Sequence, residues 1–166
     1  MRIKNEKLRI YEVDEKYLKY LGRYDKNVRT KSNRKYYGIL ITNNNIDYCI
    51  PFTSKVKKRN LKLTVNIKEK DNVIAQLTIN NMIPVNSSVV KEINIRNEKD
   101  KYYLYRELYF LRKVKVQEEV LKKAENALRV LKNKNNKDFT FFKSICCDYF
   151  ILEIKCKKWQ DVSINF

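Results

Sequence analysis

The first half of the chain alternates apolar and polar residues in short runs, which is the pattern of half-buried β-strands. Such runs cover residues 8–13, 36–42, 46–50, 62–67 and 73–79, and a further strand is expected within 89–95. The second and third runs are separated by Asn43-Asn44-Asn45, a turn sequence that tolerates positive φ. We therefore predict an antiparallel β-hairpin at this point, within a mainly antiparallel sheet.

Helical spacing of apolar residues appears in two places. Asp14 can cap a helix over residues 15–24, whose apolar side chains fall on one face. Over residues 101–132, Leu, Val and Ala recur every three or four positions with no Gly or Pro between them, so one long helix or two packed helices fit equally. Residues 151–159 fit a strand or a short helix. The pattern as a whole predicts an α+β protein.

Two adjacent hydroxyl residues, Thr53 and Ser54, follow the predicted hairpin. Pro51 has no backbone N–H and suits a strand end or edge better than a strand centre, so we expect the strand to stop here. Because an antiparallel hairpin brings its two outer ends together, Arg34 and Lys35 should lie beside the hydroxyls. Hydroxyls, backbone N–H groups and cations together can form a phosphate-binding site. The alternative is a Thr-Ser turn followed by a solvated basic loop.

Composition indicates a folded and strongly basic protein. A chain of 166 residues with 43% hydrophobic residues can bury a core, and we expect a single domain over residues 1–166. The 37 Lys and Arg outnumber the 19 Asp and Glu, which gives a net charge of +18. On a folded domain this excess points to a polyanion, RNA or DNA, rather than to a membrane surface. The residues expected to bind RNA phosphates are Arg29, Lys31, Lys55, Lys57, Lys58, Arg59 and Lys62.

The chain contains no histidine, which excludes nucleases that use a His pair and hydrolases that use a Ser-His-Asp triad. Any proton transfer must use Lys, Tyr, Asp, Glu or hydroxyl groups. The four cysteines do not form CxxC pairs, and the chain has only two glycines, so neither a zinc site nor a Gly-rich phosphate loop is expected. The open end of the hairpin, or mouth, which carries Thr53 and Ser54, shows no obvious carboxylate cluster. We therefore expect no metal, no cofactor, and free, mostly buried thiols.

No apolar run approaches the roughly 20 residues of a membrane-spanning helix. The N-terminal residues lack the apolar core of a signal peptide. The expected location is the cytoplasm.

Five segments carry a resemblance to a known family. They are Tyr17-Leu18-Lys19-Tyr20-Leu21, Gly38-Ile39-Leu40-Ile41, Ile50-Pro51-Phe52-Thr53-Ser54-Lys55, Asn81-Met82-Ile83-Pro84-Val85 and Tyr105-Arg106-Glu107-Leu108. In this order they resemble the ToxN/AbiQ family, the toxins of type III toxin–antitoxin and abortive-infection systems, over essentially the whole chain. The fold that the resemblance implies is a compact antiparallel, barrel-like sheet similar to Kid/MazF toxins, with several helices that include a long one in the C-terminal half.

The resemblance also implies an activity. Family members are expected to be endoribonucleases that cut single-stranded RNA at A-rich sites without a metal, leaving a 2′,3′-cyclic phosphate and a 5′ hydroxyl. They are expected to be neutralised by a repeated small RNA pseudoknot, with which they assemble into rings or other hetero-oligomers. RNA would then be both the substrate and the antitoxin partner.

Site residues follow from the matching motif positions. Thr53 and Ser54 match the Thr-Ser pair of the family. The family's catalytic lysine precedes the strand glycine; its spacing points to Arg34, whereas residue type favours Lys35. A tyrosine upstream of that lysine aligns near Thr30, so this chain lacks it.

The chemistry implied needs no histidine. Attack of a 2′ oxygen on its own phosphate is intramolecular, so positioning and charge stabilisation supply much of the acceleration. A lysine crowded by other cations would have a lowered pKa and could accept the 2′ proton. Whether the lysine acts as a base or as an electrostatic group stays open at this point.

Two other classes of protein fit the same charge. The first is a non-catalytic RNA-binding protein, such as a ribosome-associated factor, and the second is a structural interaction module with solvated basic faces. Tyr102, Tyr103 and Trp159 could stack on bases, although core packing is expected for most of the Tyr and Phe residues.

Overall fold

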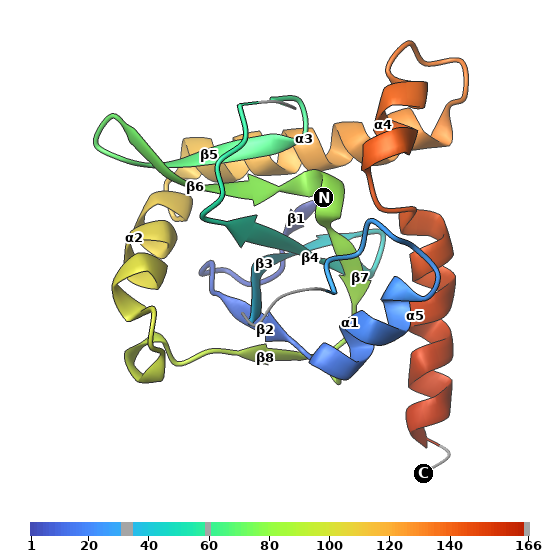
Figure 1. Cartoon of the computed structure of the whole chain (residues 1–166), viewed down its shortest axis with the longest axis horizontal. Coiled ribbons are helices and arrows are strands. Elements are labelled where there is room, and N and C mark those ends of the chain that lie inside the picture. The colour runs from blue at the N-terminus through green and yellow to red at the C-terminus, as the bar shows by residue number, and fades with distance from the viewer. Residues whose placement is uncertain (31–34, 59–60, 165–166) are drawn as a thin grey trace.

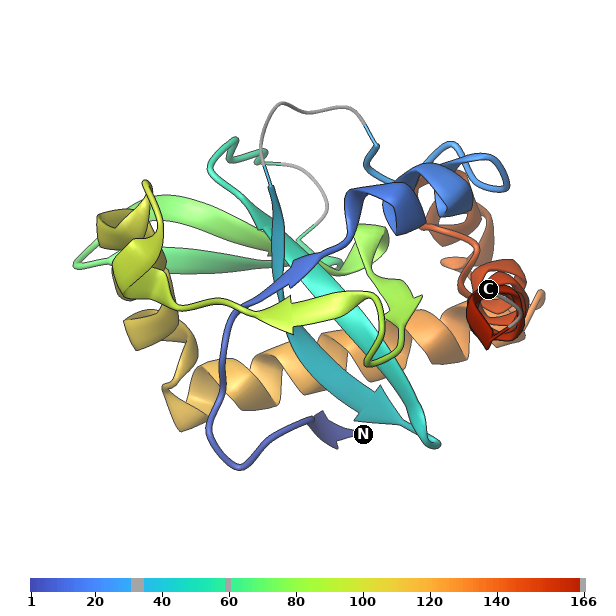
Figure 2. The same ribbon diagram turned by 90° about the horizontal axis from the view of Figure 1, so that it is seen from below.

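The computed structural model describes residues 1–30, 35–58 and 61–164, and for residues 160–164 it describes the backbone alone. An antiparallel sheet occupies the middle of the molecule (Figure 1). Helix α3 runs along one face of this sheet, whereas α2 lies at one side and α1 and α5 at the other (Figure 2). The predicted α+β class is therefore confirmed.

The sheet, over the described residues, contains eight strands that all pair in antiparallel fashion, in the order β5-β6-β4-β3-β2-β8, with β1 beside β3 and β7 beside β4. The strands are β1 Arg2–Ile3, β2 Tyr11–Val13, β3 Tyr36–Asn43, β4 Ile46–Thr53, β5 Thr64–Glu69, β6 Asn72–Thr78, β7 Ile83–Val85 and β8 Val90–Glu92. Within the described part of the chain β5 and β8 are the two edges and do not pair with each other. The expectation of a barrel-like sheet was therefore wrong. Strands β2 and β8 have only three residues each, which leaves few backbone groups to close the sheet.

The predicted hairpin is formed by β3 and β4. Its register runs from Asn43 opposite Ile46 to Gly38 opposite Pro51, and Asn44 and Asn45 have φ of 49° and 62°. Gly38 is needed because the strands approach closely here. A Cβ atom at this position would lie 2.5 Å from both Cys49 Sγ and the carbonyl oxygen of Ile50.

Pro51 lies inside a central strand rather than at its end or at an edge. On its other side, β4 pairs with β7 through residues 47–49 and with β6 through residues 52 and 53. Pro51 therefore falls where β4 changes its neighbour, a place where a missing N–H costs no ladder bond. Its carbonyl oxygen accepts a hydrogen bond from Thr78 Oγ1 at 3.1 Å. The strand continues beyond Pro51 and ends at Thr53, three residues after the predicted end at Ile50.

The helices are α1 Glu15–Gly22, α2 Lys101–Leu111, α3 Val114–Lys132, α4 Phe139–Ile145 and α5 Tyr149–Ile164, with short 3₁₀ turns at Ile79–Asn81 (η1) and Ile95–Asn97 (η2). Asp14 caps α1 by accepting a hydrogen bond from the backbone N–H of Tyr17 at 2.9 Å, as predicted. The long helical pattern forms two helices, because Lys113 adopts an extended conformation between α2 and α3. Among the helices described, none is long and apolar enough to cross a membrane.

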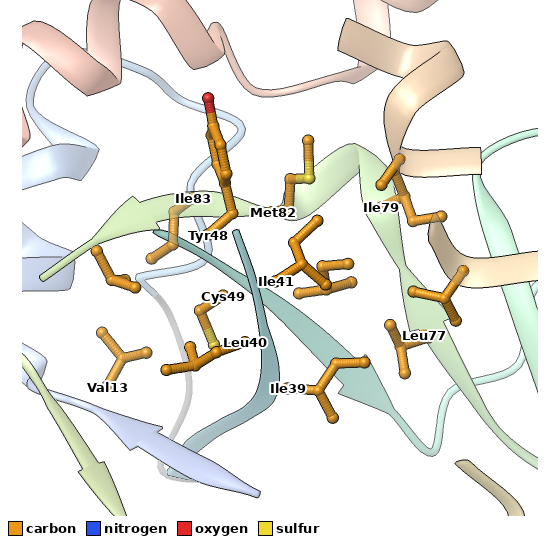
Figure 3. Close-up of a cluster of buried hydrophobic side chains, with 14 of the residues drawn as sticks. Val13, Ile39, Leu40, Ile41, Tyr48, Cys49, Leu77, Ile79, Met82 and Ile83 are labelled. Carbon is orange, nitrogen blue, oxygen red and sulfur yellow. The ribbon is translucent and has the colours of Figure 1, made fainter. Parts of the chain in front are cut away.

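The core lies at the centre of the sheet, around β3 and β4 (Figure 3). Ile39, Leu40 and Ile41 of β3 and Cys49 of β4 are almost fully buried there, together with Leu77 of β6. All four cysteines lie within the described residues and are free and buried, as expected. This packing fixes the β3–β4 hairpin, and the hairpin in turn positions the candidate site.

Candidate active site

Lys35 directly precedes β3 and lies between two carboxylates. Its Nζ is 3.2 Å from Glu98 Oε2 and 3.3 Å from Glu12 Oε2. Glu12 belongs to β2, and Glu98 follows η2, so three separate parts of the chain meet at this ammonium group. The hydrogen bonds that Lys35 donates to Glu98 and, next in size, to Glu12 raise its pKa, which keeps the side chain protonated at neutral pH.

An aromatic pair lies on the same face of the sheet. Tyr37 is two residues from Lys35 along β3, so both side chains leave the strand on one side. Its hydroxyl donates to Glu98 Oε2 at 2.5 Å, and its ring stacks on Phe52 with the centroids 6.5 Å apart. Burial and the bond to Glu98 raise the pKa of the Tyr37 phenol, while the Tyr37 and Lys35 hydrogen bonds lower the pKa of the Glu98 carboxyl.

The two hydroxyl residues lie at the open end of the hairpin. The β3–β4 register, continued past Gly38 and Pro51, places Ser54 opposite Lys35. The Tyr37–Phe52 ring contact shows that the two strands remain neighbours there. Both ends lie on the side of the sheet away from α3 (Figure 2). Thr53 is half-buried, and Ser54 is exposed.

A buried glutamine holds the loop that follows Ser54. Gln76 of β6, only 2% exposed, accepts a hydrogen bond from the Lys57 N–H at 2.9 Å and donates to the Lys57 carbonyl at 2.8 Å. The Lys55 N–H donates to Thr53 Oγ1 at 3.1 Å. These bonds fix the backbone and leave Lys55, Lys57 and Lys58 exposed, next to the hydroxyls.

The remaining predicted site residues do not all join this cluster. Lys62 binds both carboxylate oxygens of Asp138 at 2.9 Å, next to the start of α4. Arg29 is half-buried, and burial lowers its pKa. It interacts electrostatically with Tyr36, whose side chain points to the opposite face of the sheet from Lys35 and Tyr37. Arg34, Lys31 and Arg59 lie outside the described residues.

One expectation about the mouth was wrong. The mouth does contain carboxylates, Glu12 and Glu98, which the hairpin sequence alone does not show. Lys35 lies between these two carboxylates, and its hydrogen bonds to them raise its pKa rather than lower it.

Sequence reasoning also missed Tyr37, Phe52 and Glu98 as members of the site. The alternation of β3 could have indicated Tyr37, since it shares a face with Lys35. Glu98 has no such local signal, because it is 63 positions from Lys35 in the sequence.

Two solved structures share the fold of this chain. The chain superposes with a TM-score of 0.83 and 24% identity, over 93% of this chain and 99% of the other, on a structure from a bacterial type III toxin–antitoxin system with selective toxin inhibition by a non-coding RNA pseudoknot. It superposes with a TM-score of 0.77 and 20% identity, over 93% and 99%, on AbiQ, a lactococcal anti-phage endoribonuclease of the type III toxin–antitoxin system. The fold is thus that of type III toxins.

Sequence comparison shows the family itself. The family model of the toxin ToxN of type III toxin–antitoxin systems matches residues 9–157. The chain is 30% identical to Endoribonuclease ToxN of Bacillus thuringiensis subsp. kurstaki, over 92% of this chain and 84% of that protein. This protein belongs to the ToxN toxin family of type III toxin–antitoxin systems.

Proposed function

We propose that this protein is an endoribonuclease toxin that cuts single-stranded, A-rich RNA without a metal, and that a repeated small RNA antitoxin neutralises it in the cytoplasm. The observation that carries the proposal is the protonated Lys35, held between Glu12 and Glu98 at the end of the hairpin that presents Thr53 and Ser54. Its relatives ToxN and AbiQ are named endoribonucleases, which supports this assignment over a non-catalytic RNA-binding protein.

The reaction balances without any further reagent. The 2′ oxygen bonds to phosphorus, and the bond between phosphorus and the 5′ oxygen breaks. One proton leaves the 2′ hydroxyl and one is taken up by the 5′ oxygen. The products are a 2′,3′-cyclic phosphate and a 5′ hydroxyl, and the protein needs only to align the groups and stabilise charge.

Each side chain then has a defined role. Lys35 supplies a positive charge to the phosphate oxygens, and Ser54 and Thr53 donate hydrogen bonds to them. Arg34 is the second candidate for a phosphate-binding cation. Lys55, Lys57 and Lys58 hold neighbouring phosphates. A phosphate that approaches Lys35 competes with Glu12 and Glu98, so these carboxylates keep the ammonium group positioned until RNA binds.

The partner is proposed from the same chemistry. An RNA antitoxin with single-stranded segments would occupy the phosphate-binding site that the substrate needs. It would therefore inhibit the toxin. Repeated RNA units would link several toxin molecules into one protein–RNA assembly. A relative from a type III system is described with an inhibitory RNA pseudoknot, which supports this arrangement.

The test is single-turnover cleavage of an A-rich RNA in excess EDTA, measured beside equilibrium binding. Removing Lys35 or Ser54 with Lys35→Ala or Ser54→Ala should slow cleavage by about 10²–10³-fold and weaken binding far less. Thr53→Ala should have an intermediate effect, because its backbone N–H remains. The matched controls are Lys143→Ala and Ser144→Ala on α4, which should cut at the wild-type rate.

Several outcomes would contradict the proposal. If Lys35→Ala and Ser54→Ala both cut at the wild-type rate, this mouth is not the active site. If EDTA abolishes cleavage and Mg²⁺ restores it, the metal-free mechanism is wrong. If wild-type protein binds RNA tightly but cuts none, the non-catalytic alternative is correct.

A further inference from the structure

Helix α2 carries an exposed aromatic face that the candidate active site does not use. Tyr102 and Tyr109 are each 75% exposed, Tyr103 is 59% exposed and Tyr105 is 45% exposed. Tyr102, Tyr105, Arg106 and Tyr109 have the i, i+3, i+4, i+7 spacing that places side chains on one side of a helix. The opposite side, with Leu104, Leu108 and Leu111, faces the core. Core packing therefore does not explain these four tyrosines.

Cations accompany the exposed rings. Lys101 Nζ lies 5.8 Å from the centre of the Tyr102 ring, the Arg106 guanidinium lies 5.8 Å from that of Tyr103, and Lys113 Nζ lies 5.8 Å from that of Tyr109. Rings and positive charges alternate in this way on proteins that bind single-stranded nucleic acid, where bases stack and cations hold phosphates.

A groove runs between this face and the β5–β6 turn. Its volume is about 580 Å³. It is lined by the cations Lys68, Lys70, Arg106, Arg112 and Lys113, by the carboxylate of Glu69, and by Tyr105, Leu108 and Tyr109. Arg106 pairs with Glu69 at the edge of this groove. The five cations outnumber the single carboxylate of the lining, and this excess of positive charge favours an anionic partner.

The α2 face is connected to the mouth by a short piece of chain. Glu98, which binds Lys35 and Tyr37, is only three residues before the start of α2, and Tyr102 is four residues away. Four residues span at most about 14 Å. In Figure 1, α2 lies at the opposite side of the sheet from α5, next to the turn between β5 and β6.

We propose that the α2 face and its groove form a second binding site for single-stranded RNA, on which bases that flank the cleaved phosphate stack against Tyr102 and Tyr109. This inference rests on the proposed function for its choice of RNA as partner. This second site would extend the contact of the toxin with RNA beyond the phosphate-binding site at the mouth. It would also explain why α2 places tyrosines toward solvent.

The test measures binding of a fluorescein-labelled 2′-O-methyl A20 strand, which cannot be cleaved, by fluorescence anisotropy. Truncating both rings with Tyr102→Ala/Tyr109→Ala should weaken binding by about tenfold or more, since each lost base–aromatic stack has a comparable effect. Tyr102→Phe/Tyr109→Phe keeps the rings and should bind within about twofold of the wild type. Tyr24→Ala is the matched control, because Tyr24 is also exposed and lies beneath a cation, Lys155, at 3.8 Å, on the α1 side of the molecule.

A 20-base-pair RNA duplex separates stacking from charge, because its bases cannot stack on the rings. The Ala double variant should lose affinity for the strand but less than about threefold for the duplex. Equal losses for strand and duplex, or an unchanged affinity for the strand, would overturn the proposal. So would a partner protein whose binding, unlike RNA binding, depends on these tyrosines. Circular dichroism checks that each variant is folded. Because the probe is not cleavable, its measured affinity can be interpreted even if the proposed catalysis is wrong.

Discussion

Two glutamates, Glu98 just before α2 and Glu107 within it, show how surroundings change the charge of single residues. Glu98 accepts hydrogen bonds from Tyr37 and Lys35, which lower its pKa, so it is a carboxylate at neutral pH. Glu107 is only 6% exposed, and burial, with a smaller contribution from Asp100, raises its pKa to about 7. The first glutamate can position a cation, whereas the second makes the stability of the fold depend on pH.

The variant Glu107→Gln tests this dependence. The pKa of Glu107 in the folded chain is above the ordinary value of 4.5, so the folded chain binds this proton more tightly than the unfolded chain does. Stability therefore falls as the pH rises from about 4.5 to 7. Glu107→Gln should raise the free energy of unfolding at pH 8 by on the order of 1–3 kcal/mol and change it little at pH 4.

Urea unfolding at the two pH values measures the difference, with the exposed Glu125→Gln on α3 as the control. A difference between Glu107→Gln and wild type that is the same at pH 4 and pH 8 would contradict the assigned pKa shift.

Part of the candidate site could be predicted at this scale. The pairing of a basic segment with Thr53 and Ser54 follows from hairpin geometry, and the structure brings Lys35 to that end of the hairpin. The sign of the Lys35 pKa shift could not be predicted, because it depends on Glu98, which only the tertiary fold brings near. The exposure of Tyr102 and Tyr109 was equally hidden, since both faces of α2 are rich in apolar or aromatic residues.

At the scale of secondary-structure elements, β6 controls the loop that carries the basic residues. Gln76 pairs with Thr53 across the β4–β6 ladder, and its side chain binds both backbone groups of Lys57. It also donates to Asn66 Oδ1 on β5 at 2.8 Å. The side chain of Gln76 therefore joins the loop to β5, while its backbone pairs with the last residue of β4.

Removing this side chain with Gln76→Ala should free the loop. Two backbone groups of Lys57 would lose their partners, and unsatisfied polar groups of this kind cost about 1–3 kcal/mol. We expect a matching loss in the free energy of unfolding and slower single-turnover cleavage of A-rich RNA. Asn66→Ala removes only one of the three bonds and should have a smaller effect on both. Wild-type stability and cleavage in Gln76→Ala would show that the loop needs no such support.

The elements themselves were predicted unevenly. The β3–β4 hairpin, α1 and its cap, and the β5–β6 pair follow from alternation, turn residues and helical spacing. The strand expected over residues 8–13 shrinks to Tyr11–Val13, because Leu8 and Ile10 are buried without joining a regular ladder; Ile10 accepts only an isolated bond from the Ile93 N–H at 3.1 Å. The break between α2 and α3 had no Gly or Pro to signal it.

At the scale of the whole molecule, the net charge of +18 should dominate association with RNA. Much of this charge is exposed, including Lys55, Lys57 and Lys58 beside the mouth. Each phosphate that a single strand places on a cation releases counterions, so affinity falls with salt, with a slope of about 0.7 per phosphate in a plot of log affinity against log salt.

The double variant Lys57→Ala/Lys58→Ala should reduce that slope, by about 0.7 for each phosphate that the protein no longer neutralises. Anisotropy titrations of the uncleavable A20 strand at several salt concentrations measure it. Lys16→Ala/Lys19→Ala on α1 removes the same charge elsewhere and should change the slope less. An affinity that does not vary with salt would exclude phosphate binding as the main source of affinity.

The reactivity of the four buried cysteines can report where the structure opens in the natural chain. Cys49 lies in β4, Cys146 and Cys147 follow α4, and Cys156 lies in α5. Burial raises the pKa of each thiol, to about 11 for Cys146, so at neutral pH few are present as the reactive thiolate. An alkylating reagent can then modify these thiols only when the structure around them opens. The order in which they react would reveal whether the C-terminal helices detach before the sheet unfolds, with no engineered label.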